Sequence, residues 1–278
     1  MHSIKIGKNL FSLPSGWEEL TEYQVKRVAL LGGKGIEREL TALYLLSSQN
    51  LRKFLQKIDP AKIVEIARLL TFLRERQKVQ EAEDEIEPLV KSFRHKGTRY
   101  YFPEKSLNDV TVGEWMWAEV IIKKIQEEPH KAEEHLPTLL AVLCRPHRPK
   151  RERQANDFDG YPRIAFNPER IPVLEKKMKG VSPWVFYILQ DYVSRCQEML
   201  NLRYGVIFQG QKSEGLNLGW KGVVISVAEA NIFGTERHVM KENIHNVCLY
   251  LAKKIIEKKE MDKKLEEIRR NNRYARPR

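Results

Sequence analysis

The chain has 278 residues, 42% of them hydrophobic and 31% charged, and its formal net charge at pH 7 is +12. This composition excludes a wholly disordered or low-complexity chain. The sequence contains no run of 18 apolar residues, so it predicts no membrane-spanning helix. The N-terminus lacks the apolar core of a signal peptide, so we do not expect secretion. The chain has three cysteines, Cys144, Cys196 and Cys248. A small and odd number of cysteines does not suit a disulfide framework and favours a reducing compartment.

The positive charge is concentrated in two segments. The tail 253–278 has 11 Lys or Arg against 5 Asp or Glu, and residues 145–153 have 5 against 1. The remaining residues carry 33 basic and 31 acidic side chains and are close to neutral. Most of the excess positive charge therefore lies in two basic segments, and the rest of the chain is balanced. This distribution weakens an inference of nucleic-acid binding from net charge alone.

The first third of the chain has helical periodicity. Apolar residues predict a helix over 17–31, with Ser15 as its N-cap and Glu18 completing a capping box. The glycines at 32–35 that follow lack the spacing of a phosphate-binding loop and predict a turn between helices. Further helices are predicted over 36–47, 51–58 and 59–80.

The period changes after the acidic run at 81–85, which we interpret as a boundary. Residues 89–93 and 98–102 are rich in β-branched and aromatic side chains and flank His95-Lys96-Gly97. Two such runs around a glycine-containing turn predict a β-hairpin, the one β element that we expect.

Helical patterns resume after the hairpin. Thr111 and Glu114 have capping-box spacing at the start of a helix that runs to about Ile125. Further helices are predicted over 132–144, 184–202 and 241–270. Residues 223–228 fit a buried strand or a helix, and helix is favoured because strong helices surround this run. The segments 145–169 and 205–219 lack apolar periodicity and predict loops, and loops of such length are usually functional or disordered.

These elements predict a mostly α fold: a multi-helix globular body with one small β-hairpin and an extended, basic C-terminal helix. Three regions are expected along the chain. They are an N-terminal helical region (1–82), a β-hairpin plus helical core with the long basic loop 145–169 (88–204), and C-terminal helices with the basic tail (205–278).

Two motifs are candidates for metal binding. Cys144 with His147 and His245 with Cys248 could together supply four zinc ligands, but the alternative of core cysteines and surface histidines is favoured. Asp157 and Asp159 could face a cation, although this loop lacks the later ligands of a calcium site and favours a simple turn. We therefore predict no metal and no cofactor.

Catalytic signatures are absent from the sequence. No serine stands in a nucleophile elbow, no H-E-x-x-H motif occurs, and the glycines do not form a dinucleotide fingerprint. We predict a protein that is not an enzyme and has no catalytic residues.

Two surfaces are candidates for binding. Residues 145–153 and the basic C-terminal tail could neutralise phosphates in a salt-dependent manner, although no DNA- or RNA-reading motif accompanies them. The alternatives for 145–153 are an ordinary solvated loop or a site for an acidic partner protein. The candidates in this basic patch are Arg145, Arg148, Lys150, Arg151 and Arg153. The terminal helix could dock on a partner, and a frayed terminus remains the alternative. Its candidate contacts are Ile244, Leu251, Ile255, Leu265 and Ile268.

Several short motifs occur in an order that resembles a known group. Trp17-Glu-Glu-Leu-Thr21 opens the first helix, and Arg99-Tyr-Tyr-Phe-Pro103 precedes Leu107-Asn-Asp-Val-Thr-Val-Gly-Glu114. Leu139-Leu-Ala-Val-Leu143 then leads into Arg145-Pro146. Later motifs are Arg163-Ile-Ala-Phe-Asn167, Leu218-Gly-Trp220, Ile232-Phe-Gly234 and Leu249-Tyr-Leu251.

This order resembles proteins of tailed-phage and prophage structural modules, especially those of Bacteroides-type hosts. The resemblance extends over most of the chain, although Cys144 stands where those proteins are expected to have tyrosine. It implies a tail-module protein with the character of a tail assembly chaperone, which would bind the tape measure or tail tube protein in the host cytoplasm or stay with the virion. We also expect that the protein could contact nucleic acid weakly and that it has no membrane partner. The sequence does not determine the oligomeric state, and an oligomer is possible.

Overall fold

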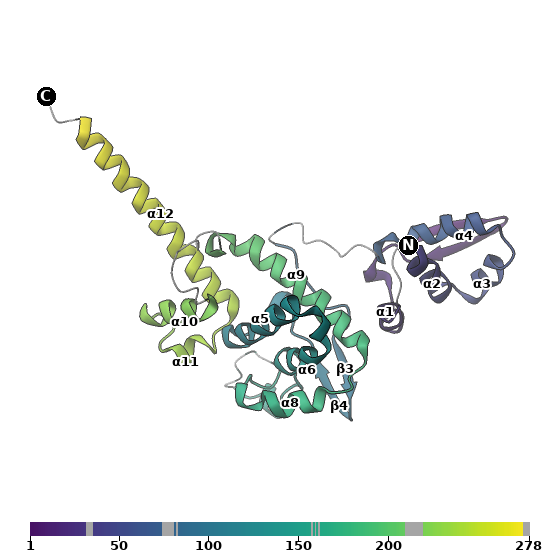
Figure 1. Ribbon diagram of the computed structural model, residues 1–278, viewed down its shortest axis with the longest axis horizontal. Coiled ribbons are helices and arrows are strands. Elements are labelled where there is room, and N and C mark those ends of the chain that lie inside the picture. Colours follow the sequence, from purple (N-terminus) through teal and green to yellow (C-terminus); the bar gives the residue numbers. More distant parts are fainter. Residues whose placement is uncertain are drawn as a thin grey trace.

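The described part of the chain contains twelve α-helices and two separate two-stranded antiparallel sheets in the computed structural model (Figure 1). The structure describes residues 1–31, 36–73, 81, 83–156, 158, 160, 162–208 and 219–274. Within those residues, no helix combines the length and the apolar character needed to cross a bilayer. The prediction of a mostly α body with a small hairpin and a long C-terminal helix is confirmed.

The chain begins with a β-hairpin that the sequence analysis did not predict. β1 (His2–Ile6) pairs antiparallel with β2 (Asn9–Leu13) around a turn at Gly7, whose φ of 61° suits glycine. Each strand buries only one side chain, Ile4 or Leu13, so the alternation is too short to stand out in the sequence.

The first helix is shorter than predicted. Trp17–Glu19 form a single 3-10 turn, and α1 comprises Glu22–Ala29. Thr21 is the N-cap: its hydroxyl accepts from the Gln24 N–H, and the Gln24 side chain accepts from the Thr21 N–H. The prediction of a cap at Ser15 is wrong, because the Glu19 carboxylate accepts hydrogen bonds from both the amide and the hydroxyl of that serine.

Three further helices complete the N-terminal region. α2 (Ile36–Leu46) and α3 (Gln49–Leu55) confirm the predicted helices, and Asp59 caps α4 (Pro60–Ala67) as predicted. The chain continues from α4 as a 3-10 segment, Arg68–Leu73, instead of an α-helix. The predicted extension over 74–80 and the glycine turn at 32–35 lie outside the described residues. Buried residues of both hairpin strands and these helices form one hydrophobic cluster, the N-terminal core.

The main body contains the predicted hairpin and most of the remaining helices. β3 (Ser92–His95) pairs antiparallel with β4 (Thr98–Tyr101), which confirms the prediction. The helices that follow are α5 (Val112–Glu127), α6 (Ala132–Leu143), α7 (Lys150–Arg153), α8 (Ile171–Met178) and α9 (Pro183–Phe208). α9 is longer than the predicted 184–202, and of the predicted loop 205–219 only 205–208 and 219 are described, both inside helices.

The C-terminal region packs into the same core as the main body. α10 (Gly219–Glu229) confirms a helix over 223–228, and α11 (Glu236–Val239) and α12 (Ile244–Tyr274) follow. Their buried side chains belong to one hydrophobic cluster with those of α5, α6 and α9, which we call the main core. The predicted regions 88–204 and 205–278 therefore share one core.

Backbone hydrogen bonds join the start of α5 to the segment before α12. The amides of Val112 and Gly113 donate to the carbonyls of Glu242 and Met240, each at 2.9 Å, so two donors at this helix start have partners from the C-terminal region. A Cβ at Gly113 would lie 2.9 Å from the Met240 carbonyl oxygen, so this approach requires glycine.

The N-terminal core meets the main body along α1 and α9. The rings of Trp17 and Tyr187 lie 6.2 Å apart, and Lys26 Nζ lies 4.8 Å from the ring centre of Trp184. At the opposite end of the molecule, α12 leaves the body and projects into solvent, as Figure 1 shows.

Candidate functional site

Four buried charged side chains lie where the long loop leaves and re-enters the body. Asp109 and Glu114 flank the start of α5, Arg145 lies two residues after the end of α6, and Arg163 lies at the far end of the loop. The side chains of Arg163, Asp109 and Glu114 are at most 1% exposed and that of Arg145 is 6% exposed. We call these four residues the buried clamp.

The two arginines bind both carboxylates. Arg145 donates from Nη1 and Nη2 to the two oxygens of Glu114, at 2.7 and 2.9 Å, and from Nε to the Ile164 carbonyl at 2.7 Å. Arg163 donates from Nε to the Asp109 carboxylate, and its Nη1 lies 3.1 Å from Glu114. Two arginines and two carboxylates balance in charge, which is the condition for stable burial of ions.

Burial and the neighbouring carboxylates act in opposite directions on the two arginines, and burial prevails at Arg145, where it lowers the pKa. Burial alone would lower the pKa of Arg163, but the carboxylates of Glu114 and Asp109 outweigh burial and raise it. The same glutamate does not close the predicted capping box: the Thr111 hydroxyl accepts from the Glu114 amide, while the Glu114 side chain turns toward the arginines. The clamp therefore fixes both ends of the loop to the start of α5.

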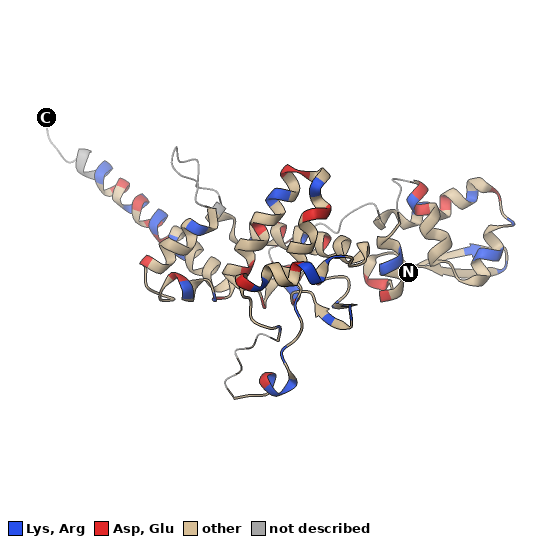
Figure 2. Cartoon of the chain, turned by 60° about the horizontal axis from the view of Figure 1, so that its bottom comes forward, with Lys and Arg blue, Asp and Glu red and all other residues tan. Residues whose placement is uncertain are grey.

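The loop between the clamped ends is the predicted basic segment. It contains one short helix, α7, and an isolated antiparallel bridge between His147 and Arg163. Figure 2 shows the part around α7 standing away from the body, with its Lys and Arg positions in blue. We call residues 148–160 the basic arm; Asp157 and Asp159 of the predicted cation loop lie outside the described residues.

The predicted basic patch is divided by burial. Arg145 is 5% exposed and bound to Glu114, so the prediction that it belongs to a solvent-facing patch is wrong. Arg148 is half-buried and donates from Nε to the Arg163 carbonyl. Lys150, Arg151 and Arg153 are exposed, and these three remain available to a partner.

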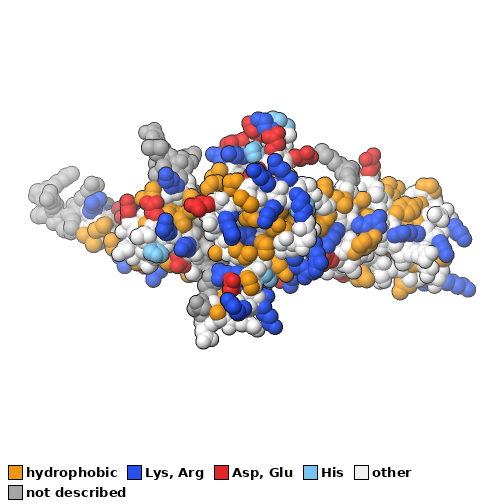
Figure 3. All heavy atoms as spheres, turned by 90° about the horizontal axis from the view of Figure 1, so that it is seen from below, with side chains coloured by type: hydrophobic (Ala, Val, Ile, Leu, Met, Phe, Trp, Pro, Cys, Tyr) orange, Lys and Arg blue, Asp and Glu red, His pale blue; other side chains and the backbone are white. Residues whose placement is uncertain are grey.

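A groove of about 840 Å³ lies beside the clamp. The start of α5 and α11 line it, together with residues 164–170 from the returning end of the loop. Its lining side chains include six cations and three acids, and two of the acids, Asp109 and Glu114, are bound in the clamp. Figure 3 shows Lys and Arg side chains among hydrophobic ones over the middle of the lower face.

The predicted partner-binding residues of α12 also divide by burial. Ile244 is fully buried in the main core, so its assignment to a binding surface is wrong. Leu251 packs against that core and Ile255 is half-buried. Leu265 and Ile268 are 48% and 55% exposed, on the part of α12 that projects away from the body in Figure 1.

The residues of the two cysteine–histidine pairs are buried or packed against neighbouring side chains. Cys144 is buried, and the His147 ring stacks on Tyr101 with ring centres 3.4 Å apart. Burial raises the pKa of Cys248 to about 12, so its thiol stays protonated at neutral pH in these surroundings.

The remaining histidine of these pairs is bound on both ring nitrogens. His245 Nε2 lies 2.6 Å from the Ser106 carbonyl, and Nδ1 lies 3.0 Å from the Tyr204 hydroxyl. Across the described residues, no cluster of three or more His, Cys, Asp or Glu is arranged to hold a metal.

The clamp is not predicted by the local patterns of the sequence. Asp109 and Arg163 are 54 residues apart in the chain, and charged side chains are normally expected at the surface. The one available signal was that Asp109, Glu114 and Arg163 all lie within the motifs of the phage-module resemblance.

Comparison of the chain with protein-family models, curated proteins and solved structures finds no match.

Proposed function

We propose that this chain is a non-enzymatic assembly protein of a tailed phage or prophage, with the character of a tail assembly chaperone. Its partner would be a helical tail protein, the tape measure or the tail tube protein, bound in the host cytoplasm. The phage assignment rests on the motif order in the sequence. The binding role rests on the exposed half of α12.

The single observation that supports binding is an apolar stripe without a partner in the described chain. Every residue of 256–270, the distal half of α12, is exposed. Within it, Met261, Leu265 and Ile268 recur at i, i+4 and i+7 and therefore share one helix face. A solvent-surrounded helix of this length is marginal in water, and an amphipathic partner helix would stabilise it by covering the stripe.

The stripe is bordered by charges of both signs. Lys258 and Asp262 flank it on one side of the helix, and Glu260 and Lys264 flank it on the other. An apolar line between charged flanks is the usual pattern of a helix-pairing surface, in which flanking charges select partner and orientation.

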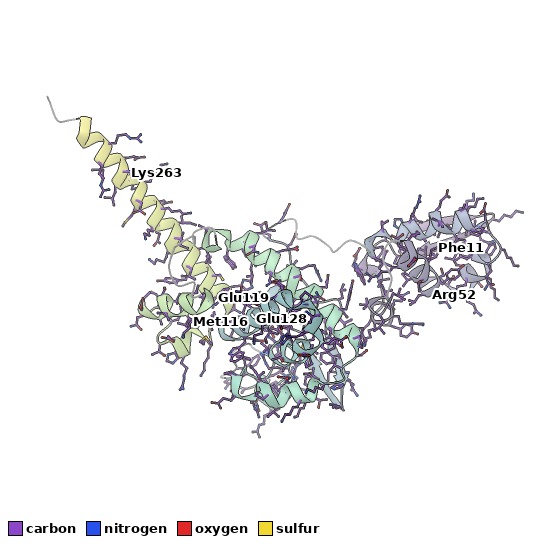
Figure 4. All side chains as sticks on the ribbon, viewed as in Figure 1. Phe11, Arg52, Met116, Glu119, Glu128 and Lys263 are labelled. Carbon is purple, nitrogen blue, oxygen red and sulfur yellow. The ribbon has the colours of Figure 1, made fainter. Side chains whose placement is uncertain are left out.

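Truncation after Ile256 tests the proposal. The main core ends at Ala252, so the truncated chain should keep its thermal unfolding midpoint and lose co-purification with the co-expressed tape measure or tail tube protein. Leu265→Glu with Ile268→Glu should have the same effect. Lys263→Glu, on the opposite helix face and labelled in Figure 4, is the matched control and should retain the partner. Partner retention by the truncated chain would refute the proposal.

A second candidate function is nucleic-acid binding by the basic arm. It is favoured by the exposure of Lys150, Arg151 and Arg153 on a loop whose ends are fixed by the clamp. Neutralising these three residues should flatten the dependence of DNA affinity on salt, by a slope of about 0.9 for each phosphate that the protein no longer neutralises. No retention on heparin or DNA at low salt would exclude this function.

A further inference from the structure

The returning end of the loop has one paired edge and one open edge. On the paired edge, the Arg148 amide donates to the Pro162 carbonyl at 2.8 Å and the Ile164 amide donates to the Pro146 carbonyl at 2.9 Å. In extended chain, alternate residues direct their N–H and C=O groups to opposite edges. Ala165 and Asn167 therefore direct their N–H and C=O groups away from residues 146–148, with which the paired edge forms its hydrogen bonds.

The open edge is unpaired in the described chain. Neither the N–H nor the C=O of Ala165 has a hydrogen-bond partner among the described residues, and the same is true of the Asn167 N–H. Both residues are exposed, and Asn167 has extended backbone angles, with φ −140° and ψ 112°. An exposed, extended edge of this kind is a template for another extended chain.

Charge and shape around this edge indicate the class of ligand. The open edge lies in the wall of the 840 Å³ groove, whose other lining residues include Phe166 and Met240. Arg170, Arg237 and Lys241 are exposed there and form no ion pair within the described residues, and Glu169 is the one exposed acid in the lining. The groove thus offers backbone donors and acceptors, apolar surface and uncompensated positive charge together.

We infer that this groove binds an extended, acidic segment of another protein, which adds a strand along Ala165–Asn167. Backbone hydrogen bonds supply affinity, alternate apolar side chains contact Phe166 and Met240, and acidic side chains meet Arg170, Arg237 and Lys241. Nucleic acid fits this groove less well for two reasons. Part of the lining is apolar, which does not favour a phosphate backbone, and the buried cations Arg145 and Arg163 are already bound to carboxylates. This site is separate from α12 and does not depend on the proposed function.

Fluorescence anisotropy with the full chain and a labelled decapeptide of alternating Glu and Val tests the inference. The peptide should bind, and its Lys–Val counterpart should not. N-methylation of all the peptide's backbone amides should weaken binding about tenfold or more, because no peptide N–H can then donate to the edge in either strand direction. Equal binding of the N-methylated peptide would overturn strand addition, and no binding of the Glu–Val peptide would overturn the site.

Charge reversal locates the site on the protein. Arg170→Glu with Arg237→Glu should weaken the Glu–Val peptide about tenfold or more, while Lys263→Glu on distal α12 should leave it unchanged. Equal weakening by both variants would indicate diffuse attraction and overturn the inference. Tighter binding of a labelled DNA duplex, with the same dependence on Arg170 and Arg237, would reassign the groove to nucleic acid.

Truncation after Ile256 separates this inference from the proposed function. The truncated chain should bind the Glu–Val peptide as the full chain does, whether or not it has lost the tail partner. Loss of peptide binding on truncation would place the peptide on α12 and overturn the groove assignment.

Discussion

The buried clamp and the distal half of α12 are both rich in charge, yet their surroundings are opposite. In the clamp, Arg163 and Asp109 are 1% exposed and every charge meets a fixed partner. Along distal α12, the Lys254–Glu257 pair is about half exposed at each side chain and is surrounded by solvent. Burial, and not residue type, therefore decides whether a charged residue stabilises the fold or remains available to a partner.

The largest expected effect is removal of one clamp carboxylate. Glu114→Ala leaves Arg145 without its carboxylate partner and should lower the free energy of unfolding by about 3–5 kcal/mol. Urea unfolding followed by circular dichroism measures this change. The matched control is Glu127→Ala on the same helix, where the side chain is 61% exposed and pairs with Lys123 at 3.8 Å, so a change below about 1 kcal/mol is expected. Equal effects of the two variants would contradict the assigned role of burial.

The clamp also marks the limit of what the sequence could predict. Helices such as α2, α5 and α6 follow from local periodicity, since their spacing depends only on neighbouring residues. The Thr111 cap was predicted for the same reason, but the direction of the Glu114 side chain was not, because it is decided by Arg145, 31 residues away. Pairings over such separations leave no local pattern.

The N-terminal elements show the same limit at shorter range. The hairpin β1–β2 has one buried residue in each strand and no strong turn dipeptide, so its alternation was too weak to detect. The groove was predictable only in part. A count of charges along the sequence identifies the basic segment 145–153. It does not identify Arg170, Arg237 and Lys241 as members of the same site, because they come from distant parts of the chain.

The next largest effect compares the two halves of one helix. Ile244→Ala opens a cavity in the main core and should cost about 2–5 kcal/mol. Leu265→Ala, at 48% exposure on distal α12, should change stability by less than about 0.5 kcal/mol. Both values come from the same urea titration. A large cost at Leu265 would mean that distal α12 is already covered, which would remove the surface on which partner binding depends.

A smaller effect concerns pH. Burial lowers the pKa of His245 below its usual value, and its Nε2 lies against the Ser106 carbonyl. The unfolded chain therefore binds a proton at a pH where the folded chain does not, so stability should decrease as pH falls through about 6.5. His245→Gln should reduce the difference between urea midpoints at pH 7.5 and pH 5.5. Parallel pH profiles for the two proteins would rule out this contribution.

The smallest expected effect returns to the exposed charges of α12. Glu257 bonds to Lys254 at 2.9 Å, and this pairing lowers the pKa of its carboxyl group. Because water and salt screen a pair on an isolated helix, Glu257→Gln should give no resolved shift of the thermal unfolding midpoint, at either 20 or 500 mM salt. Its effect should appear instead in the rate of association with the partner, since rim charges steer encounter. A midpoint shift as large as that of Glu114→Ala would show that the distal charges hold the fold, and the contrast between the two regions would then disappear.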